Sequence, residues 1–361
     1  MVSRLFRGTA LALVAAFIAT AFAQYGYQPF FDQPLIQSRA YGMELILVRL
    51  RAIDQFDAPL DDDLMELIEL IGESDVNRFI GTVRAADPEL AEELLDEIEE
   101  LEEKAEEGRN HHGSVREVRE LTERAYDLII PSEIRKSPAF LAALIADLTL
   151  GEGGIAEGYE EAILDEEPFL FTGGWSSLQS VKELWSQLAV YATPAQAADV
   201  NEMLAQLDGI YFAPEPPEPL VGNPEEAEAP AQRMLGLIEP IADAEVFAGR
   251  DMQALAVSLV ATQAQACRAY EAGNDEVGLE GVYAVGEMYA RYLAGFLGFM
   301  APDVHEEAAE TIYALTGIQD EGAEDEDDED EEDERPAVAD PADACRELLE
   351  ALEEAVEVLG G

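Results

Sequence analysis

VGLEGVYAVGEMYARYLAGFLGFM, residues 277–300, is the stretch that decides the fold. On a helical wheel its apolar side chains cover nearly the whole circumference, and only Glu280, Glu287 and Arg291 share a narrow polar strip. A helix that is apolar nearly all round is normally enclosed by neighbouring helices, and three charges argue against a membrane span. We therefore predict a buried central helix, in which the spacing of Glu287 and Arg291 lets them pair. Its glycines favour close helix packing, with a ligand groove as the alternative.

The rest of the chain shows the same helical character. From residue 40 onward apolar residues recur every three to four positions, and no convincing strand pattern occurs. A capping residue stands directly before Pro88, Pro138 and Pro194, which is the usual start of a helix. The sequence therefore predicts an all-α fold, a multi-helix bundle or an array of helical hairpins in two halves.

One proline-rich segment divides these halves. Residues 213–219 read APEPPEP, and proline interleaved with glutamate favours an extended spacer. We predict a linker at 213–222 between an N-terminal helical domain, 40–212, and a C-terminal one, 223–319. An aromatic N-terminal arm, 24–39, precedes the first of these domains.

The C-terminal end has two distinct parts. Residues 324–334 are consecutive acids, which repel one another and cannot form a core. We therefore predict a disordered acidic tether at 320–339. Residues 340–361 follow as an amphipathic helix whose apolar stripe should dock on the body of the protein.

The start of the chain resembles a secretory signal peptide. Arg4 and Arg7 form a short basic start, residues 11–21 are apolar, and residues 21–23 supply an Ala-x-Ala cleavage site. We expect residues 1–23 to be removed, with a membrane anchor as the alternative. The mature protein is then periplasmic or extracellular and has no further transmembrane segment.

The charge of the chain restricts its partners and its medium. The chain has 78 acidic and 21 basic residues and a formal net charge of −57. The only lysines are Lys104, Lys136 and Lys182. A surface of this kind repels itself unless counterions screen it, so we expect adaptation to a salty, halophilic medium. No basic patch exists to neutralise phosphates, so nucleic acid is not an expected partner.

The two cysteines lie on apolar helical stripes. Cys267 belongs to a stripe within residues 251–272, and Cys345 to that of the last helix. In an exported chain this placement predicts a disulfide that clips the last helix to the C-terminal domain. Two buried free thiols are the alternative.

No complete catalytic motif occurs: HExxH, GxSxG and the P-loop are all absent. The best candidate metal site is a group of carboxylates at helical spacing, Glu157, Glu160, Glu161 and Asp165. These groups repel one another, and a hard cation such as Ca²⁺ would relieve the repulsion. In a chain so rich in acids, a solvated acidic face is the competing explanation. We expect no other cofactor.

Three functions fit these features. The first is a non-catalytic binding or scaffold protein of the cell envelope with a protein partner. The second is a carboxylate-based protein that binds Ca or Fe and assists transport. The third is an enzyme that uses paired carboxylates in a helical groove, which needs two acids with opposed pKa shifts.

Overall fold

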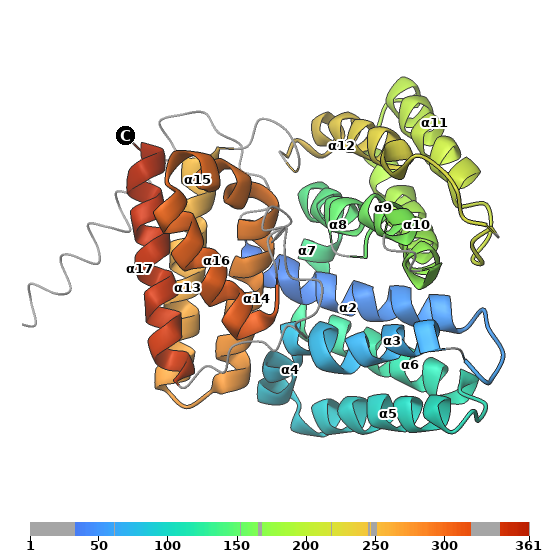
Figure 1. Ribbon diagram of the computed structural model, residues 1–361, viewed down its shortest axis with the longest axis horizontal. Coiled ribbons are helices and arrows are strands. Elements are labelled where there is room, and N and C mark those ends of the chain that lie inside the picture. Colours follow the sequence, from blue (N-terminus) through green and yellow to red (C-terminus); the bar gives the residue numbers. More distant parts are fainter. Residues whose placement is uncertain are drawn as a thin grey trace, which may run out of the picture.

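The computed structural model describes residues 33–60, 62–151, 153–164, 168–217, 219–244, 246, 251–318 and 340–360. Every regular element in these ranges is helical, so the all-α prediction is confirmed (Figure 1). The predicted signal peptide and the predicted tether at 320–339 lie outside the described residues. No helix in the described ranges is long and apolar enough to cross a membrane.

The first part of the chain forms a group of helices around α2. Its elements are α2 (Pro34–Ile53), α3 (Asp62–Leu70), the π turn η1 (Ile71–Asp75), the 3-10 turn η2 (Val76–Arg78), α4 (Ile80–Ala86), α5 (Pro88–Glu106), α6 (His112–Ile129) and α7 (Ser132–Arg135). Because α2 starts at Pro34, the last six residues of the predicted arm 24–39 are helical instead.

A second group packs on the other side of α2 (Figure 1). Its elements are α8 (Pro138–Leu150), α9 (Glu157–Leu164), α10 (Pro168–Leu188), η3 (Ala189–Tyr191), α11 (Pro194–Ile210), η4 (Pro224–Glu226) and α12 (Glu228–Ala242).

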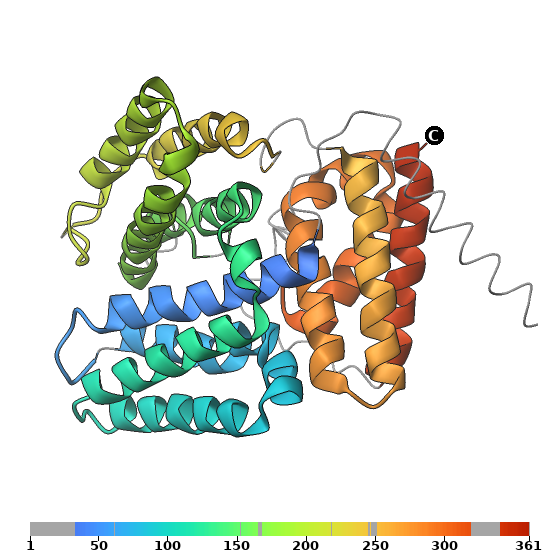
Figure 2. The same cartoon turned by 180° about the vertical axis from the view of Figure 1, so that it is seen from behind.

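The remaining helices form a separate bundle, which Figure 2 shows from behind. They are α13 (Met252–Glu271), α14 (Asp275–Tyr289), the π turn η5 (Ala290–Ala294), α15 (Gly295–Met300), α16 (Pro302–Thr316) and α17 (Pro341–Gly360). As predicted, the last helix docks: α17 packs against α13 and α16.

The predicted helix starts are formed by side-chain caps. The Asp87 carboxylate accepts a hydrogen bond from the backbone N–H of Leu90 at 3.1 Å. Thr193 and Gln196 form a complete capping box at the start of α11. These caps satisfy backbone donors that the first turn of a helix leaves without partners.

The buried apolar residues divide into two cores. The first core runs from residue 40 to 246 and the second from residue 255 to 355. Helix α12 packs against α11 and α8, so the first core continues across the proline-rich segment. The division of the cores therefore does not coincide with the linker predicted at 213–222.

The central stretch, residues 277–300, is enclosed over most of its length. Most of α14 is buried, including Val282, Val285 and Met288, each at most 1% exposed. Beyond η5 the prediction fails, because Phe299 is 85% exposed. A π turn closes on residue i+5, so side chains beyond it face directions that a regular helical wheel does not predict.

Candidate functional site

Six charged side chains meet where the two cores join, and we call them the junction cluster. They are Arg49, Asp75, Arg78, Asp147, Glu287 and Arg291. The first five are buried, and the Arg291 side chain is 12% exposed. Three are positive and three are negative. A buried charge is tolerated only when a partner of opposite sign and hydrogen bonds compensate for lost water, and this cluster meets both conditions.

Asp75 and Arg78 form the centre of this cluster. Arg49 Nε donates to Asp75 Oδ2 at 2.6 Å, and Arg78 Nη1 donates to Asp75 Oδ1 at 3.3 Å. Arg78 Nε donates to Glu287 Oε1 at 2.5 Å. Burial raises the pKa of the Glu287 carboxyl, and Arg78 partly opposes that rise. Arg78 thus connects the first core to α14.

Asp147 makes the second connection between the cores. Gln37 Nε2 donates to its two carboxylate oxygens at 3.0 and 2.9 Å. Arg291 Nη1 forms an ion pair with Asp147 Oδ1. The Tyr41 ring lies within 6 Å of both cations, with the guanidinium carbons of Arg78 and Arg291 at 5.9 and 5.8 Å from its centroid.

Glu280 forms a third link beside the cluster. Arg39 Nε donates to Glu280 Oε2 at 2.9 Å, while the backbone N–H and the hydroxyl of Thr82 donate to its two oxygens at 2.6 Å each. All three charged residues of the polar strip on the central helix therefore contact side chains on the helices that form the first core.

Both π turns carry residues of the junction cluster. Asp75 is the last residue of η1, and Arg291 is the second residue of η5. Close backbone approach is needed as well, because a Cβ on Gly151 would lie 2.5 Å from both Arg291 Nη2 and the Tyr41 hydroxyl. Single π turns are frequent at functional sites. Here they aim a carboxylate and a guanidinium at the same interface.

Sequence reasoning missed four members of this cluster. Glu287 and Arg291 were noticed, but their contacts with Arg78 and Asp147 could not be read from spacing. One signal was present: Asp147 is the only charged residue in PAFLAALIADLTL, the sequence of α8. A lone charge in an apolar helix points to a buried partner of opposite sign.

The structure describes three of the four predicted metal ligands. Glu157, Glu160 and Glu161 lie on α9, each partly buried, whereas Asp165 is outside the described residues. No group of three or more His, Cys, Asp or Glu suited to a metal ion was found among residues with a described position. The cation site at these four positions stays a prediction.

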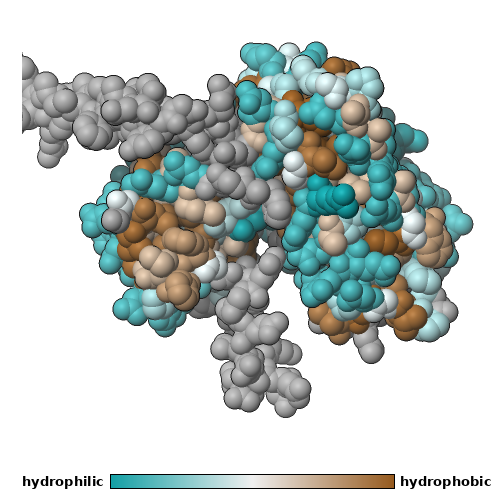
Figure 3. Space-filling model, turned by 90° about the horizontal axis from the view of Figure 1, so that it is seen from above, coloured by the Kyte–Doolittle hydropathy of each residue, from teal (hydrophilic) through white to brown (hydrophobic). Residues whose placement is uncertain are grey.

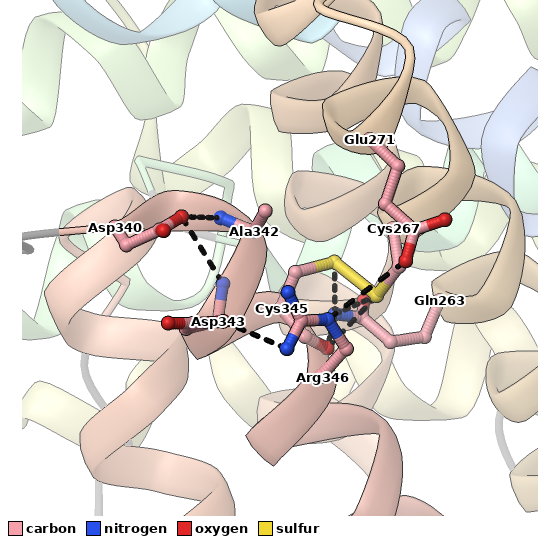
Figure 4. Close-up of a disulfide and its surroundings, with 8 residues drawn as sticks. All are labelled: Gln263, Cys267, Glu271, Asp340, Ala342, Asp343, Cys345 and Arg346. Atoms are coloured by element: carbon pink, nitrogen blue, oxygen red, sulfur yellow. Dashed lines mark hydrogen bonds and ion pairs between the residues drawn. A yellow bond between two sulfur atoms is a disulfide. The ribbon is translucent and has the colours of Figure 1, made fainter.

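The cysteines lie together. Cys267 on α13 and Cys345 on α17 have Cα atoms 5.5 Å apart and sulfur atoms at disulfide distance (Figure 4). Gln263 Nε2 donates to the backbone carbonyl of Cys345 at 3.0 Å. A covalent bond here would hold α17 on the bundle at its N-terminal end.

The proline-rich segment is an anchored surface loop, which we call the proline loop, residues 212–222. The Tyr211 hydroxyl donates to the Ile155 carbonyl at 2.7 Å, and the Thr172 hydroxyl donates to the Pro214 carbonyl at 3.0 Å. At the ends of the loop, Phe212 and Val221 are 66% and 76% exposed. The scaffold thus holds the start of the loop, while two large apolar side chains at its ends face water.

No protein-family model, curated protein or solved structure matches the chain. The functional argument therefore rests on the contacts and exposures of its own residues.

Proposed function

We propose that this is an exported, non-catalytic binding or scaffold protein of the cell envelope, which binds a protein partner through the proline loop. The observation that carries the proposal is the exposure of Phe212 and Val221 at the two ends of that loop. Exposed apolar surface rimmed by polar residues marks interaction sites, and these two side chains flank a segment of prolines and glutamates.

The composition of the loop adds to this argument. Residues 213–219 contain four prolines, whose fixed φ lowers the entropy that is lost on binding. Extended proline-rich segments dock into grooves lined by aromatic side chains. The exposed Glu215 within the loop favours a partner whose groove has a basic rim.

The junction cluster supports a non-catalytic role. Its charged groups are bound to one another, three positive against three negative, and they join two cores. Such ion pairs hold the two cores in a fixed position relative to each other. Export is supported by the signal-like sequence at residues 1–23 and by the cysteine pair at disulfide distance.

A photo-crosslinking experiment tests the binding site. p-Benzoylphenylalanine replaces Phe212 in one variant and Val190, which is 75% exposed on η3, in a matched control. In cells of the source organism, we expect a discrete adduct from position 212 that position 190 does not form. The crosslinked protein is then purified, and its affinity for the wild type and for Pro216→Ala/Pro217→Ala is measured. Equal adducts at both positions, or equal affinities, would refute the proposal.

The rival proposal is carboxylate-based binding of Ca or Fe in support of transport. Three partly buried glutamates on the short helix α9 favour it. Calorimetry with Ca²⁺ and Fe²⁺ in molar salt separates the two functions. A saturable heat that Glu160→Gln/Glu161→Gln removes would establish the cation site, whereas heat from charge screening alone would dismiss it.

A further inference from the structure

Ion pairs join the two parts of this protein. We call residues 33–246, which hold the first core, the first body, and residues 251–318 and 340–360, which hold the second core, the second body. Figures 1 and 2 both show α14 of the second body beside α2 of the first. Along α14 and η5, four charged residues contact the first body: Glu276, Glu280, Glu287 and Arg291. Their partners of opposite sign are, in the same order, Arg84, Arg39, Arg78 and Asp147.

The two apolar cores do not merge at this contact. The buried apolar side chains form two separate clusters, one in each body. Tyr283 is buried on α14 but belongs to neither cluster, and the guanidinium carbon of Arg78 lies 4.9 Å from its ring centroid. Charged groups therefore supply much of the contact between the bodies. Domain contacts that are polar usually permit relative motion, unlike large hydrophobic ones.

The junction cluster is balanced on each side of this contact. Its first-body members are two cations and two acids, and Arg78 already pairs with Asp75 at 3.3 Å. Its second-body members, Glu287 and Arg291, are four residues apart, a spacing at which opposite charges pair on a helix. When the bodies part, these charges pair within their own body or gain water. Parting therefore avoids the large cost of an uncompensated charge in the interior.

The net charge of the bodies opposes their contact. The first body has 47 acidic and 14 basic residues, and the second has 17 acidic and 3 basic residues. Hydrophilic residues cover much of the first body in the view of Figure 3. Repulsion between two such bodies extends over about 30 Å in roughly 0.01 M salt but over only about 3 Å in molar salt. Buried ion pairs are screened much less, so salt weakens the repulsion more than the contact.

We propose that the junction is a salt-dependent conformational switch: the two folded bodies close on each other in molar salt and part in dilute buffer, where the charges of the junction cluster pair within each body. The chain passes from the first body to the second once, between residues 246 and 251, so the parted bodies stay tethered. Closure and parting thus change the relative position of two helical bodies without unfolding either core.

A distance measurement on the full protein tests this switch. p-Acetylphenylalanine that carries a nitroxide label replaces Gln206 on α11 and Gln265 on α13, two exposed positions on different bodies. In the control protein the labels replace Gln206 and Gln55, which are both exposed on the first body. Pulsed electron spin resonance measures both pairs between about 0.05 and about 3 M KCl, and circular dichroism follows the helical content. We expect the distance between Gln206 and Gln265 alone to lengthen at low salt.

Two results would overturn the proposal. The first is a distance between Gln206 and Gln265 that stays the same at every salt concentration at which the protein remains helical. The second is a lengthening that occurs only together with loss of helical content or with a change in the distance between Gln206 and Gln55. That result would mean that the protein unfolds and that the bodies do not part as folded units.

A charge-matched pair of variants tests the ion pairs themselves. Arg39→Gln/Arg84→Gln removes two cations that cross the junction, whereas Arg109→Gln/Arg124→Gln removes two cations from ion pairs within the first body. Both variants take two positive charges from the first body. The first variant should part at a KCl concentration at least roughly twofold higher than the wild type, and the control should shift much less. Equal shifts would refute the role of the junction, because net charge alone would then govern the transition.

Discussion

Arg78 donates a hydrogen bond to Glu287 at 2.5 Å, although the two residues are 209 positions apart in the sequence. Both are buried, with 1% and 8% of their surfaces exposed. The pair joins η2 in the first core to α14 in the second. Without Arg78, the Glu287 carboxylate would lose its paired cation in the interior, so the pair is a sensitive point of the fold.

Replacement of Arg78 by methionine should therefore destabilise the protein strongly. It removes the cation that pairs with Glu287 and one of the two cations that pair with Asp75, for an expected loss of about 3–5 kcal/mol in the free energy of unfolding. Arg84→Met is the control, because Arg84 and Glu276 form an exposed pair whose loss should cost less than about 1 kcal/mol. Denaturant unfolding in molar salt measures both variants, and similar losses would contradict this reading of the junction.

Glu44 should make the stability fall as the pH rises from 4.5 to about 7. Burial raises the pKa of its carboxyl to about 7, Glu183 adds to the rise, and Arg51 and the Tyr126 hydrogen bond oppose it. The folded protein favours the protonated form, so this contribution is present below pH 4.5 and is lost as pH rises through about 7.

Glu44→Gln cannot lose this proton, so it should gain stability relative to the wild type between pH 5 and pH 8. The expected gain is at most about 3 kcal/mol. Glu69→Gln, at an exposed position, is the matched control and should show no comparable trend. A pH-independent difference between Glu44→Gln and the wild type would exclude the effect.

His111 should have the opposite effect and make the stability fall as the pH decreases. Burial lowers the pKa of its imidazole from the ordinary 6.5, the neighbouring His112 adds to this, and the negative charge of Asp54 opposes it. Below pH 6.5 the unfolded chain therefore binds more protons, and stability falls as the pH decreases. The expected slope is at most about 1.4 kcal/mol per pH unit.

Denaturant unfolding of the wild type and His111→Gln between pH 5 and pH 7 checks this. The variant should lose part of the acid sensitivity, whereas His305→Gln should keep it. An unchanged slope in His111→Gln would show that other groups cause the loss of stability in acid.

The cysteine pair should resist alkylation in the native protein. Intact-mass measurement should find no alkylated thiol without reductant and two after reduction and unfolding. Removal of the link by Cys345→Ser should lower the free energy of unfolding by about 4 kcal/mol in the chain-entropy model. Two thiols that react without reductant would refute the disulfide.

The acidic surface should make the fold depend on salt. With a net charge of −57, repulsion in dilute buffer is long-range, and molar salt screens it within about 3 Å. We expect a clearly higher melting temperature in 2–3 M KCl than in roughly 0.01 M salt. Equal melting temperatures would remove the case for adaptation to a salty medium.

Some features of this protein could be predicted from sequence because they depend on neighbours within one or two helical turns. The caps at Asp87 and Thr193 need only a side chain three residues before its backbone donor. The placement of Cys267 and Cys345 on apolar stripes also depends only on nearby residues. Both stripes face the second core.

The proline loop shows why domain organisation was harder to predict. Its composition is that of a spacer, yet Tyr211 and Thr172 anchor it, and α12 beyond it returns to the first core. A proline-rich sequence fixes the local extension of the backbone but not the direction in which the following helix packs.

The sequence by itself determined the helical fold, the helix starts, the acidic surface and the enclosure of most of the central helix. The tertiary structure decided that Glu287 binds Arg78, that Arg291 binds Asp147, and that Phe299 faces outward beyond a π turn. The physical reason is the range of the interactions. Helical periodicity and capping act over a few residues, whereas a buried charge accepts any suitable partner that folding brings near it, whatever its distance along the chain.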